Sequence, residues 1–200
     1  DIKRKKMLSS EESLKILKET KALIEGHFVL SSGLHSAKYV QCGQLMSKPH
    51  KAIKICESLA EKINKEINNF DLILSPAMGG IIIGYEIGKL LKKETIFSER
   101  VNNQFQLRRD FEIKKDTKVL IVEDVITTGK SSLECSKLVT LNKGIIVGYA
   151  CIIDRSNGKS EIKNKIVSQI KLNIPTFSKD NLPKELSAIE PVKPGSRNLK

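Results

Sequence analysis

Two adjacent acidic residues, Glu123 and Asp124, lie in the stretch VLIVEDVITTGKSS, between an apolar run and the turn Thr127-Thr128-Gly129. Carboxylates can accept hydrogen bonds from vicinal hydroxyl groups such as those of a ribose. The turn opens a predicted helix, and backbone N–H groups at a helix N-terminus bind phosphate with the help of the helix dipole. Because carboxylates and phosphate repel each other, one ligand must satisfy both. A pentose that carries a terminal phosphate does so.

This stretch is not a P-loop, because the pattern G-x-x-x-x-G-K-[ST] requires a glycine five residues before Gly129, where this chain has Asp124. The alternative interpretation is an acidic pair that caps the helix by chance.

Two further elements could bind the same ligand. The stretch Ser75–Ile81 (SPAMGGI) follows another apolar run, and its small residues allow backbone N–H groups to approach a ligand closely. A plain strand-to-helix turn explains the same composition equally well. Asp154 and Arg155 end a third apolar run. Because open parallel sheets bind ligands beyond the carboxyl ends of their strands, we expect the three elements to lie together.

The histidines give a weaker signal. His27, His35 and His50 are not spaced as metal ligands, and no acid or nucleophile accompanies them. We interpret them as surface or packing residues, with catalysis by His35 as the alternative.

Apolar runs alternate with helix-forming segments through most of the chain. This alternation favours an α/β fold with a mainly parallel central sheet flanked by helices on both faces. We predict strands at Phe70–Ser75, Glu94–Ser98, Lys118–Val122 and Gly144–Asp154, a weaker one in the IVSQIKLNI stretch, and helices at Pro49–Ile67, Ile81–Leu91 and Lys130–Leu141.

The N-terminal part reads differently. Ser9 and Glu12 match a capping box and predict a helix that runs to about Glu25. Two β-prone runs and a turn follow: Phe28–Leu30, Lys38–Gln41 and Ser32-Gly33.

The stretch Glu99–Asp116 is polar and charged, with Asn102-Asn103 where a hairpin would turn. Long polar connections of this kind often act as lids or are disordered. We find no repeat and no long linker, and we therefore predict a single domain over residues 1–200.

Composition limits the class of protein. The apolar content of 40% and charged content of 29% are ordinary for a globular domain. No apolar run approaches the roughly 20 residues of a membrane span, and the basic N-terminus has no apolar stretch behind it, so we expect no membrane anchor and no secretory signal. The net charge of +12 suits polyanionic ligands, but the lysines are spread along the chain, so a nucleic-acid surface is the less favoured interpretation.

Four cysteines, Cys42, Cys56, Cys135 and Cys151, contain no C-x-x-C pair, and three of them lie in strongly apolar segments. We predict reduced core thiols, a cytoplasmic location and no zinc site.

The stretch VLIVEDVITTGKS resembles the phosphoribosyl-pyrophosphate (PRPP) motif of type I phosphoribosyltransferases, and SPAMGGI resembles their pyrophosphate loop, with a non-proline cis peptide expected at Ala77–Met78. FVLSSGLHSAKYVQCG and IIDRSNG resemble the base-binding segments of the orotate phosphoribosyltransferase family. ERVNNQFQLRRDFEI and PVKPGSR resemble one bacterial and archaeal branch of it.

The resemblance implies a type I phosphoribosyltransferase fold with a small N-terminal hood subdomain, formed by about residues 1–45 and the C-terminal tail, and a flexible lid loop at about residues 99–116. It implies a Mg²⁺-dependent transfer of ribose-5-phosphate from PRPP to orotate, giving orotidine 5′-phosphate and pyrophosphate in pyrimidine biosynthesis. It also implies a homodimer, and Mg²⁺ that enters with PRPP and takes no ligand set from the protein alone.

The site residues that the resemblance implies fall into three groups. Asp124, Glu123 and Arg100 are the catalytic candidates. The PRPP contacts are Ala77, Met78, Gly79, Gly80, Arg100, Glu123, Asp124, Val125, Ile126, Thr127, Thr128, Gly129, Lys130 and Ser131, and the orotate contacts are Tyr39, Thr127 and Arg155.

Two alternatives stay open. The PRPP motif does not select the base, so a purine or uracil phosphoribosyltransferase has the same motif. A regulator that senses PRPP and binds nucleic acid without catalysis would also keep it, although no separate basic domain is visible.

Overall fold

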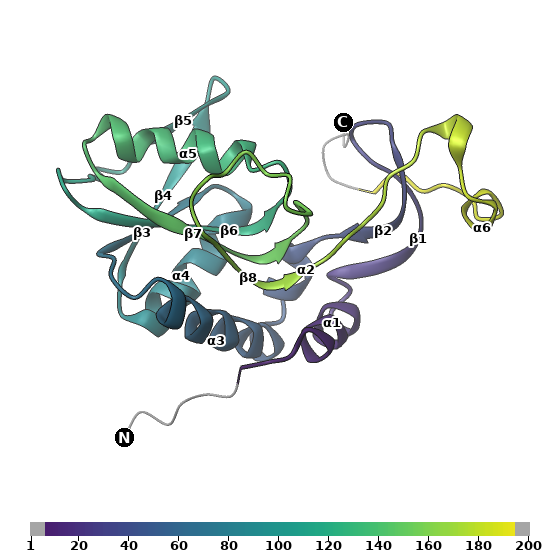
Figure 1. Ribbon diagram of the computed structural model, residues 1–200, viewed down its shortest axis with the longest axis horizontal. Helices are drawn as coiled ribbons and strands as arrows, with labels where there is room; N and C mark the ends of the chain where they lie inside the picture. Colours follow the sequence, from purple (N-terminus) through teal and green to yellow (C-terminus); the bar gives the residue numbers. More distant parts are fainter. Residues whose placement is uncertain (1–6, 195–200) are drawn as a thin grey trace.

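A computed structural model describes residues 7–194, whose main body is a six-stranded sheet between layers of helices (Figure 1). In chain order the strands are β3 (Leu72–Pro76), β4 (Glu94–Val101), β5 (Gln104–Leu107), β6 (Lys118–Ile126), β7 (Ile145–Asp154) and β8 (Ile166–Lys171). Their order in the sheet is β5-β4-β3-β6-β7-β8, and neighbours are parallel except for β4 and β5. The predicted mainly parallel sheet is confirmed, and its strand order reverses between β3 and β6.

Both faces of the sheet are covered, which explains why its strands read as continuous apolar runs. On one face, α3 (Pro49–Glu66) and α4 (Gly79–Leu91) bury a cluster that includes Ile73, Leu120 and Val122. On the other face, α5 (Lys130–Leu141) packs on a cluster that includes Val119 and Ile121. The four cysteines are buried in these clusters, and none forms a disulfide within the described part of the chain, as the sequence predicts.

A smaller subdomain contains segments from the N-terminal and C-terminal parts of residues 7–194. The antiparallel strands β1 (Leu23–Val29) and β2 (His35–Val40) form a hairpin, and α2 (Cys42–Met46) leads from it into the main body. The C-terminal segment, with η1 (Lys179–Asn181) and α6 (Lys184–Ser187), returns beside the hairpin (Figure 1). Isolated bridges pair Phe28 with Val192 and His35 with Phe177.

Two histidines hold this subdomain together. His27 and His35 are buried, and their Nε2 and Nδ1 atoms lie 2.6 Å apart. The other ring nitrogen of His27 lies 2.8 Å from the carbonyl oxygen of Ile189 in the C-terminal segment. The packing role predicted for these histidines fits this arrangement, whereas their mutual contact was not predicted. His50 is exposed.

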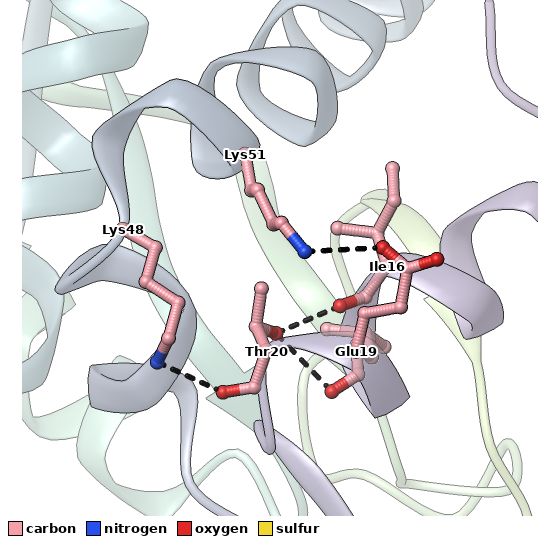
Figure 2. Close-up of polar contacts among 6 residues, drawn as sticks. Ile16, Glu19, Thr20, Lys48 and Lys51 are labelled. Carbon is pink, nitrogen blue, oxygen red and sulfur yellow. Dashed lines mark hydrogen bonds and ion pairs between the residues drawn. The ribbon is translucent and has the colours of Figure 1, made fainter.

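The helix predicted to run to about Glu25 ends earlier, because α1 spans Ser10–Glu19. The capping box at its start is confirmed. At its end, the Thr20 hydroxyl donates to the carbonyl oxygen of Ile16 at 2.8 Å, and Lys48, the N-cap residue of α3, donates to the Thr20 carbonyl at 3.1 Å (Figure 2). Lys21 then has a positive φ of 62°, and the chain turns into β1.

Cross-strand pairing decides the other boundary differences. Ile24, expected in the helix, pairs with Tyr39 in the β1–β2 hairpin. Strand β6 runs four residues past the predicted end at Val122, because it stays paired with β7 as far as Ile126 and Asp154.

The polar stretch that begins at Glu99 forms the predicted hairpin. Its tip lies at Asn102 and Asn103, which have positive φ values of 49° and 63°. Phe105 in β5 packs into the core, so this hairpin extends the edge of the sheet. The resemblance at Gly195–Arg197 and the basic residues before Met7 lie outside the described residues.

None of the helices within residues 7–194 is long and apolar enough to cross a membrane.

The capping box allows a direct test of α1. Ser9 Oγ accepts from the Glu12 N–H at 3.1 Å, and Glu12 Oε2 accepts from the Ser9 N–H at 2.8 Å. Ser9→Ala should lower the free energy of unfolding by about 1 kcal/mol, because the N–H of Glu12 loses its acceptor. Urea denaturation measures this change. Ser10→Ala, one exposed position later, should change stability by less than about 0.5 kcal/mol. Equal effects of the two substitutions would contradict a role for the cap.

Candidate functional site

The three elements singled out in the sequence meet at the carboxyl ends of neighbouring parallel strands. β3 and β6 are parallel neighbours, so the loop at Ala77 and Met78 after β3 and the turn Thr127–Gly129 after β6 leave the sheet side by side, at the point where the strand order reverses. The backbone N–H of Arg155, after β7, donates to the carbonyl oxygen of Ile126 at 2.8 Å. Open parallel sheets bind their ligands at the carboxyl ends of their strands, near such a reversal.

Asp124 lies directly against the loop that follows β3. A Cβ atom added to Gly79 would come within 2.7 Å of Asp124 Oδ2, so any larger residue at position 79 would displace the carboxylate. Asp124 Oδ1 also accepts from the N–H of Val125 at 2.9 Å, which fixes its direction. Burial raises the pKa of Asp124 above its ordinary value, and the bond from Val125 opposes that shift.

The Ser75–Gly80 loop has the expected backbone. The peptide bond between Ala77 and Met78 is cis, as the resemblance implies. Met78 points outward with 84% of its side chain exposed, and Gly79 and Gly80 begin α4. A Cβ on Gly80 would lie 3.2 Å from the carbonyl oxygen of Val122, so the start of α4 packs tightly against β6. The loop therefore presents backbone groups beside Asp124.

Glu123 points to the other face of β6, because successive side chains of a strand alternate. Its side chain is only 6% exposed and lies near Ser132 in the first turn of α5. Burial raises the pKa of Glu123 to about 7; the charge of Asp124 adds to the shift, and Ser132 opposes it. Glu123 Oε1 and Ser132 Oγ do not meet the geometry of a hydrogen bond, and within residues 7–194 neither atom has another partner.

The turn after β6 has the geometry of an anion site. Gly129 is the N-cap of α5 and has a φ of +83°, which favours glycine. Thr127 and Thr128 are exposed, as are Lys130 and Ser131 at the start of the helix. Thr128 Oγ1 accepts from the N–H of Lys130 at 3.3 Å. The N–H groups that follow in the first turn lack intrahelical acceptors, so they are free to bind an anion.

Two residues of the same stretch contribute in another way. Val125 packs against one core cluster and Ile126 is buried in the other. Val125 is half-buried, and the buried side chain of Ile126 cannot reach a ligand in solvent. The N–H of Val125 already donates to Asp124, and the carbonyl of Ile126 already accepts from Arg155.

Arg155 is a half-buried cation without an acidic partner. Burial lowers its pKa, and over the described range its Nε has no hydrogen-bond partner and its guanidinium forms no ion pair. An unpaired cation in this position favours binding of an anionic group, because burial makes an uncompensated charge costly.

Arg100 lies on the β4–β5 hairpin and is already engaged. Its guanidinium donates to Glu134 Oε2 at 2.6 Å and to the Asn103 carbonyl at 2.8 Å, and it stacks on the Phe105 ring at 4.2 Å. Glu134 belongs to the second helical turn of α5, so Arg100 lies beside the helix that begins at the Thr127–Gly129 turn.

Tyr39 belongs to the β1–β2 hairpin, where its ring packs on Phe28 with 5.7 Å between centroids. The structure therefore places it in the small subdomain rather than on the six-stranded sheet that carries the other candidates.

Two residues of this region were missed by the sequence analysis, Ser132 and Glu134. The only local signal was their position: one and two helical turns into the segment that the PRPP motif opens. Their contacts with Glu123 and Arg100 depend on how α5 packs against β6 and the β4–β5 hairpin, which no spacing rule predicts.

The carboxylates do not form a metal cage. Across residues 7–194 no group of three or more His, Cys, Asp or Glu side chains is arranged to hold a metal ion. Mg²⁺ commonly binds through one or two carboxylates together with phosphate oxygens and water, and the exposed side of Asp124 fits that mode.

A separate groove of about 400 Å³ lies between the β1–β2 hairpin and the C-terminal segment. Its walls are mostly apolar, with Ala37, Ile174 and Phe177 among them. Glu123, Asp124 and the turn Thr127–Gly129 do not line this groove. The carboxyl ends of β3 and β6 are therefore the better candidate site.

Comparisons with known proteins agree with this geometry. The phosphoribosyl transferase domain family matches residues 46–182. An orotate phosphoribosyltransferase of Parvibaculum lavamentivorans is 42% identical over 193 residues, which is 96% of this chain and the whole of that protein.

Solved structures show the same fold. An orotate phosphoribosyltransferase from Aeropyrum pernix superposes with a TM-score of 0.70 at 24% identity, over 79% of this chain and 92% of that one. An adenine phosphoribosyltransferase from Thermoanaerobacter pseudethanolicus superposes with a TM-score of 0.58 at 19% identity, over 68% and 88%.

The buried carboxyl group of Glu123 should make stability depend on pH. Its pKa is about 7 in the folded protein and near 4.5 when exposed, so between these values the folded state keeps a proton that the unfolded state releases. Its contribution is therefore fully present below pH 4.5 and is lost as the pH rises through about 7. Glu123→Gln, which stays neutral, should match the wild type at low pH and be more stable by up to about 3 kcal/mol above pH 7.

Denaturation midpoints across this pH range measure the difference. The control is Glu112→Gln at an exposed position, which should give no pH-dependent gain. A constant difference between wild type and Glu123→Gln at every pH would show that folding does not shift the pKa of Glu123.

Proposed function

We propose that this chain, which belongs to the orotate phosphoribosyltransferase family, transfers ribose-5-phosphate from PRPP to N1 of orotate. The products are orotidine 5′-phosphate and pyrophosphate, in a step of pyrimidine biosynthesis. The bond from C1′ to the pyrophosphate oxygen breaks, and the bond from C1′ to N1 forms.

One observation carries the proposal: the contact between Gly79 and Asp124 beside the turn at Gly129. PRPP has a 5′-phosphate, two ring hydroxyls and a pyrophosphate group. The turn offers N–H groups for the phosphate, Asp124 offers an acceptor for a hydroxyl, and the loop at Gly79 offers backbone groups for the pyrophosphate. Asp124 lies between the turn and the Gly79 loop, as the ribose hydroxyls of PRPP lie between its 5′-phosphate and its pyrophosphate.

Arg155 supports orotate as the acceptor base. Orotate carries a carboxylate, and a planar guanidinium binds carboxylates with two parallel hydrogen bonds. Since Arg155 is half-buried and unpaired among the described residues, a carboxylate would compensate its charge. Thr127 follows Ile126, whose carbonyl holds the Arg155 backbone, so we place it near the base as well. Tyr39 would reach the base only from the hairpin side.

Catalysis needs no protein nucleophile in this scheme. Orotate is already an anion, and the reaction passes through positive charge at C1′. The protein holds donor and acceptor in line, places dipoles around the pyrophosphate and excludes water. Mg²⁺ bound to the donor would supply positive charge to the departing pyrophosphate. Asp124 would orient the ribose hydroxyls, and Glu123 would hold the first turn of α5 or reach a hydroxyl.

Arg100 is proposed for the pyrophosphate side, with the segment from Glu99 to about residue 116 as a lid. To bind pyrophosphate, Arg100 must exchange its contact with Glu134 for the ligand.

We also propose a homodimer. Three large apolar side chains are exposed in a row at the start of α4: Met78 at 84%, Ile82 at 54% and Tyr85 at 63%. Their spacing places them on one face of the helix, next to the pyrophosphate loop. A second copy packed on this face would cover the apolar area and would adjoin the active site.

A cytoplasmic location is proposed because all four cysteines are buried as free thiols within the described structure, which fits a reducing compartment.

The function is tested by incubating the protein with PRPP, MgCl₂ and orotate, uracil, adenine or hypoxanthine in separate reactions. Loss of orotate absorbance with release of pyrophosphate, abolished by a chelator, supports the proposal. Consumption of another base would assign a different phosphoribosyltransferase, and PRPP binding with no base consumed would point to a regulator.

Asp124→Asn should lower kcat/KM by about 10²–10³-fold, because the variant loses a charged acceptor aimed at the donor. The thermal midpoint should stay the same or rise, since burial already disfavours the charged form. The control is Asp180→Asn, at an exposed position in η1 and outside the residues assigned to the site. Unchanged turnover in the Asp124 variant would remove this residue from the mechanism.

The dimer is tested with Tyr85→Glu, which should shift the mass measured by sedimentation equilibrium from two chains to one. Leu141→Glu is the control, because Leu141 is 77% exposed at the far end of α5. A single-chain mass for the wild type at micromolar concentration would contradict the proposed dimer.

A further inference from the structure

The connection between β7 and β8, from Arg155 to Lys165, is polar except for one residue. Its sequence is RSNGKSEIKNK, and Ile162 is its only apolar side chain. Most of the segment is exposed, but Ile162 is only 7% exposed and belongs to the core cluster on the α5 face of the sheet. A single buried isoleucine in an exposed polar connection implies a specific packing role.

Ile162 packs directly on the phosphate-binding turn. A Cβ atom added to Gly129 would lie 2.8 Å from Ile162 Cγ1 and 2.9 Å from Cδ1. Gly129 has a φ of +83°, and glycine adopts many backbone conformations at similar energy. Its own preference therefore does not fix the turn, and neighbouring atoms must do so. Ile162 is the side chain that fills the space where Gly129 has none.

The residue before Ile162 adds a second contact. The N–H of Glu161 donates to the carbonyl oxygen of Thr128 at 3.0 Å. Two consecutive residues of the connection thus hold two consecutive residues of the turn, one by packing and one by a hydrogen bond. Together they restrict both the carbonyl of Thr128 and the backbone of Gly129.

The same connection begins at the base side of the site. The N–H of Arg155 donates to the carbonyl oxygen of Ile126, just before the turn. Between these ends the chain is compact, since Ser156 bonds Asp154 Oδ1 at 2.8 Å and Lys159 bonds the Ser156 carbonyl at 2.8 Å. The connection therefore contacts β6 on the base side of the turn and the turn itself on the phosphate side.

We infer that Ile162 is a positioning residue for the 5′-phosphate of the donor. It acts through Gly129, and it holds the N–H groups at the start of α5 in the geometry that binds phosphate. This inference rests on the proposed function, which assigns the turn to that phosphate. The loop at Gly79, which we assign to pyrophosphate, lies after a different strand and is independent of Ile162.

The test compares two probes that share no subsite. Ribose 5-phosphate contains the 5′-phosphate, and inorganic pyrophosphate contains only the leaving group. Ile162→Ala leaves a cavity against Gly129, so the turn should relax. Because small misplacements of binding groups are costly, affinity for ribose 5-phosphate should fall about 10-fold or more, with pyrophosphate affinity unchanged. Isothermal titration of the full chain with each probe, in the presence of MgCl₂, measures both.

The matched control is Ile96→Ala. Ile96 is 3% exposed, belongs to the same core cluster and pairs with Leu74 near the amino end of β4, outside the proposed lid. It should lose comparable stability but bind both probes as the wild type does. Ile162→Val, which removes one methylene, should fold and weaken ribose 5-phosphate by about 2- to 3-fold. In turnover, Ile162→Ala should raise KM for PRPP more than it lowers kcat.

Three results would overturn the inference. Equal binding of ribose 5-phosphate by the wild type and both Ile162 variants would show that the turn does not need this contact. Equal losses for both probes, or for Ile162→Ala and Ile96→Ala, would show only a general loss of stability. A wild type that binds no ribose 5-phosphate would remove the assignment of the turn itself. Turnover of orotate by the wild type tests the proposed function separately.

Discussion

The site depends on the close approach of two parallel strands, β3 and β6, at the point where the strand order of the sheet reverses. Their carboxyl ends release two loops side by side, and the absence of a side chain at Gly79 lets the first loop touch Asp124. Every other candidate contact is arranged around this point. Backbone N–H groups can serve two separate anions here only because glycine at positions 79 and 129 leaves them uncovered.

The neighbouring carboxyl groups of Glu123 and Asp124 differ in burial. Strand alternation sends Asp124 toward the α4 face and Glu123 toward the α5 face. Asp124 keeps a backbone donor and a partly exposed side, so it remains available to a ligand. Glu123 is buried beside the Ser132 hydroxyl, which has no hydrogen-bond partner among residues 7–194, and burial raises the pKa of Glu123 to about 7. The ionised form of Glu123 therefore lowers the stability of the fold, and shifts of this kind cluster at functional sites.

The segments outside the sheet complete the site. The β7–β8 connection packs on the turn at Gly129 through Ile162, and the β4–β5 hairpin carries Arg100 to α5. The small subdomain is held by the contact between His27 and His35 and by the bridge to the C-terminal segment. These contacts join residues far apart in the chain, so the site is assembled by the whole fold rather than by one motif.

The sequence by itself determined the layered α/β fold, the approximate strands and helices, and the motifs at the strand ends. Continuous apolar runs and the helix cap at Ser9 are local signals that read the same in any surroundings. Only the tertiary structure decided that α1 ends at Glu19 and that β6 extends to Ile126. It alone also placed Ser132, Glu134 and Ile162 beside the candidate residues Glu123, Arg100 and Gly129. Strand pairing and side-chain packing made those decisions, because both depend on neighbours that lie distant in the sequence and close in space.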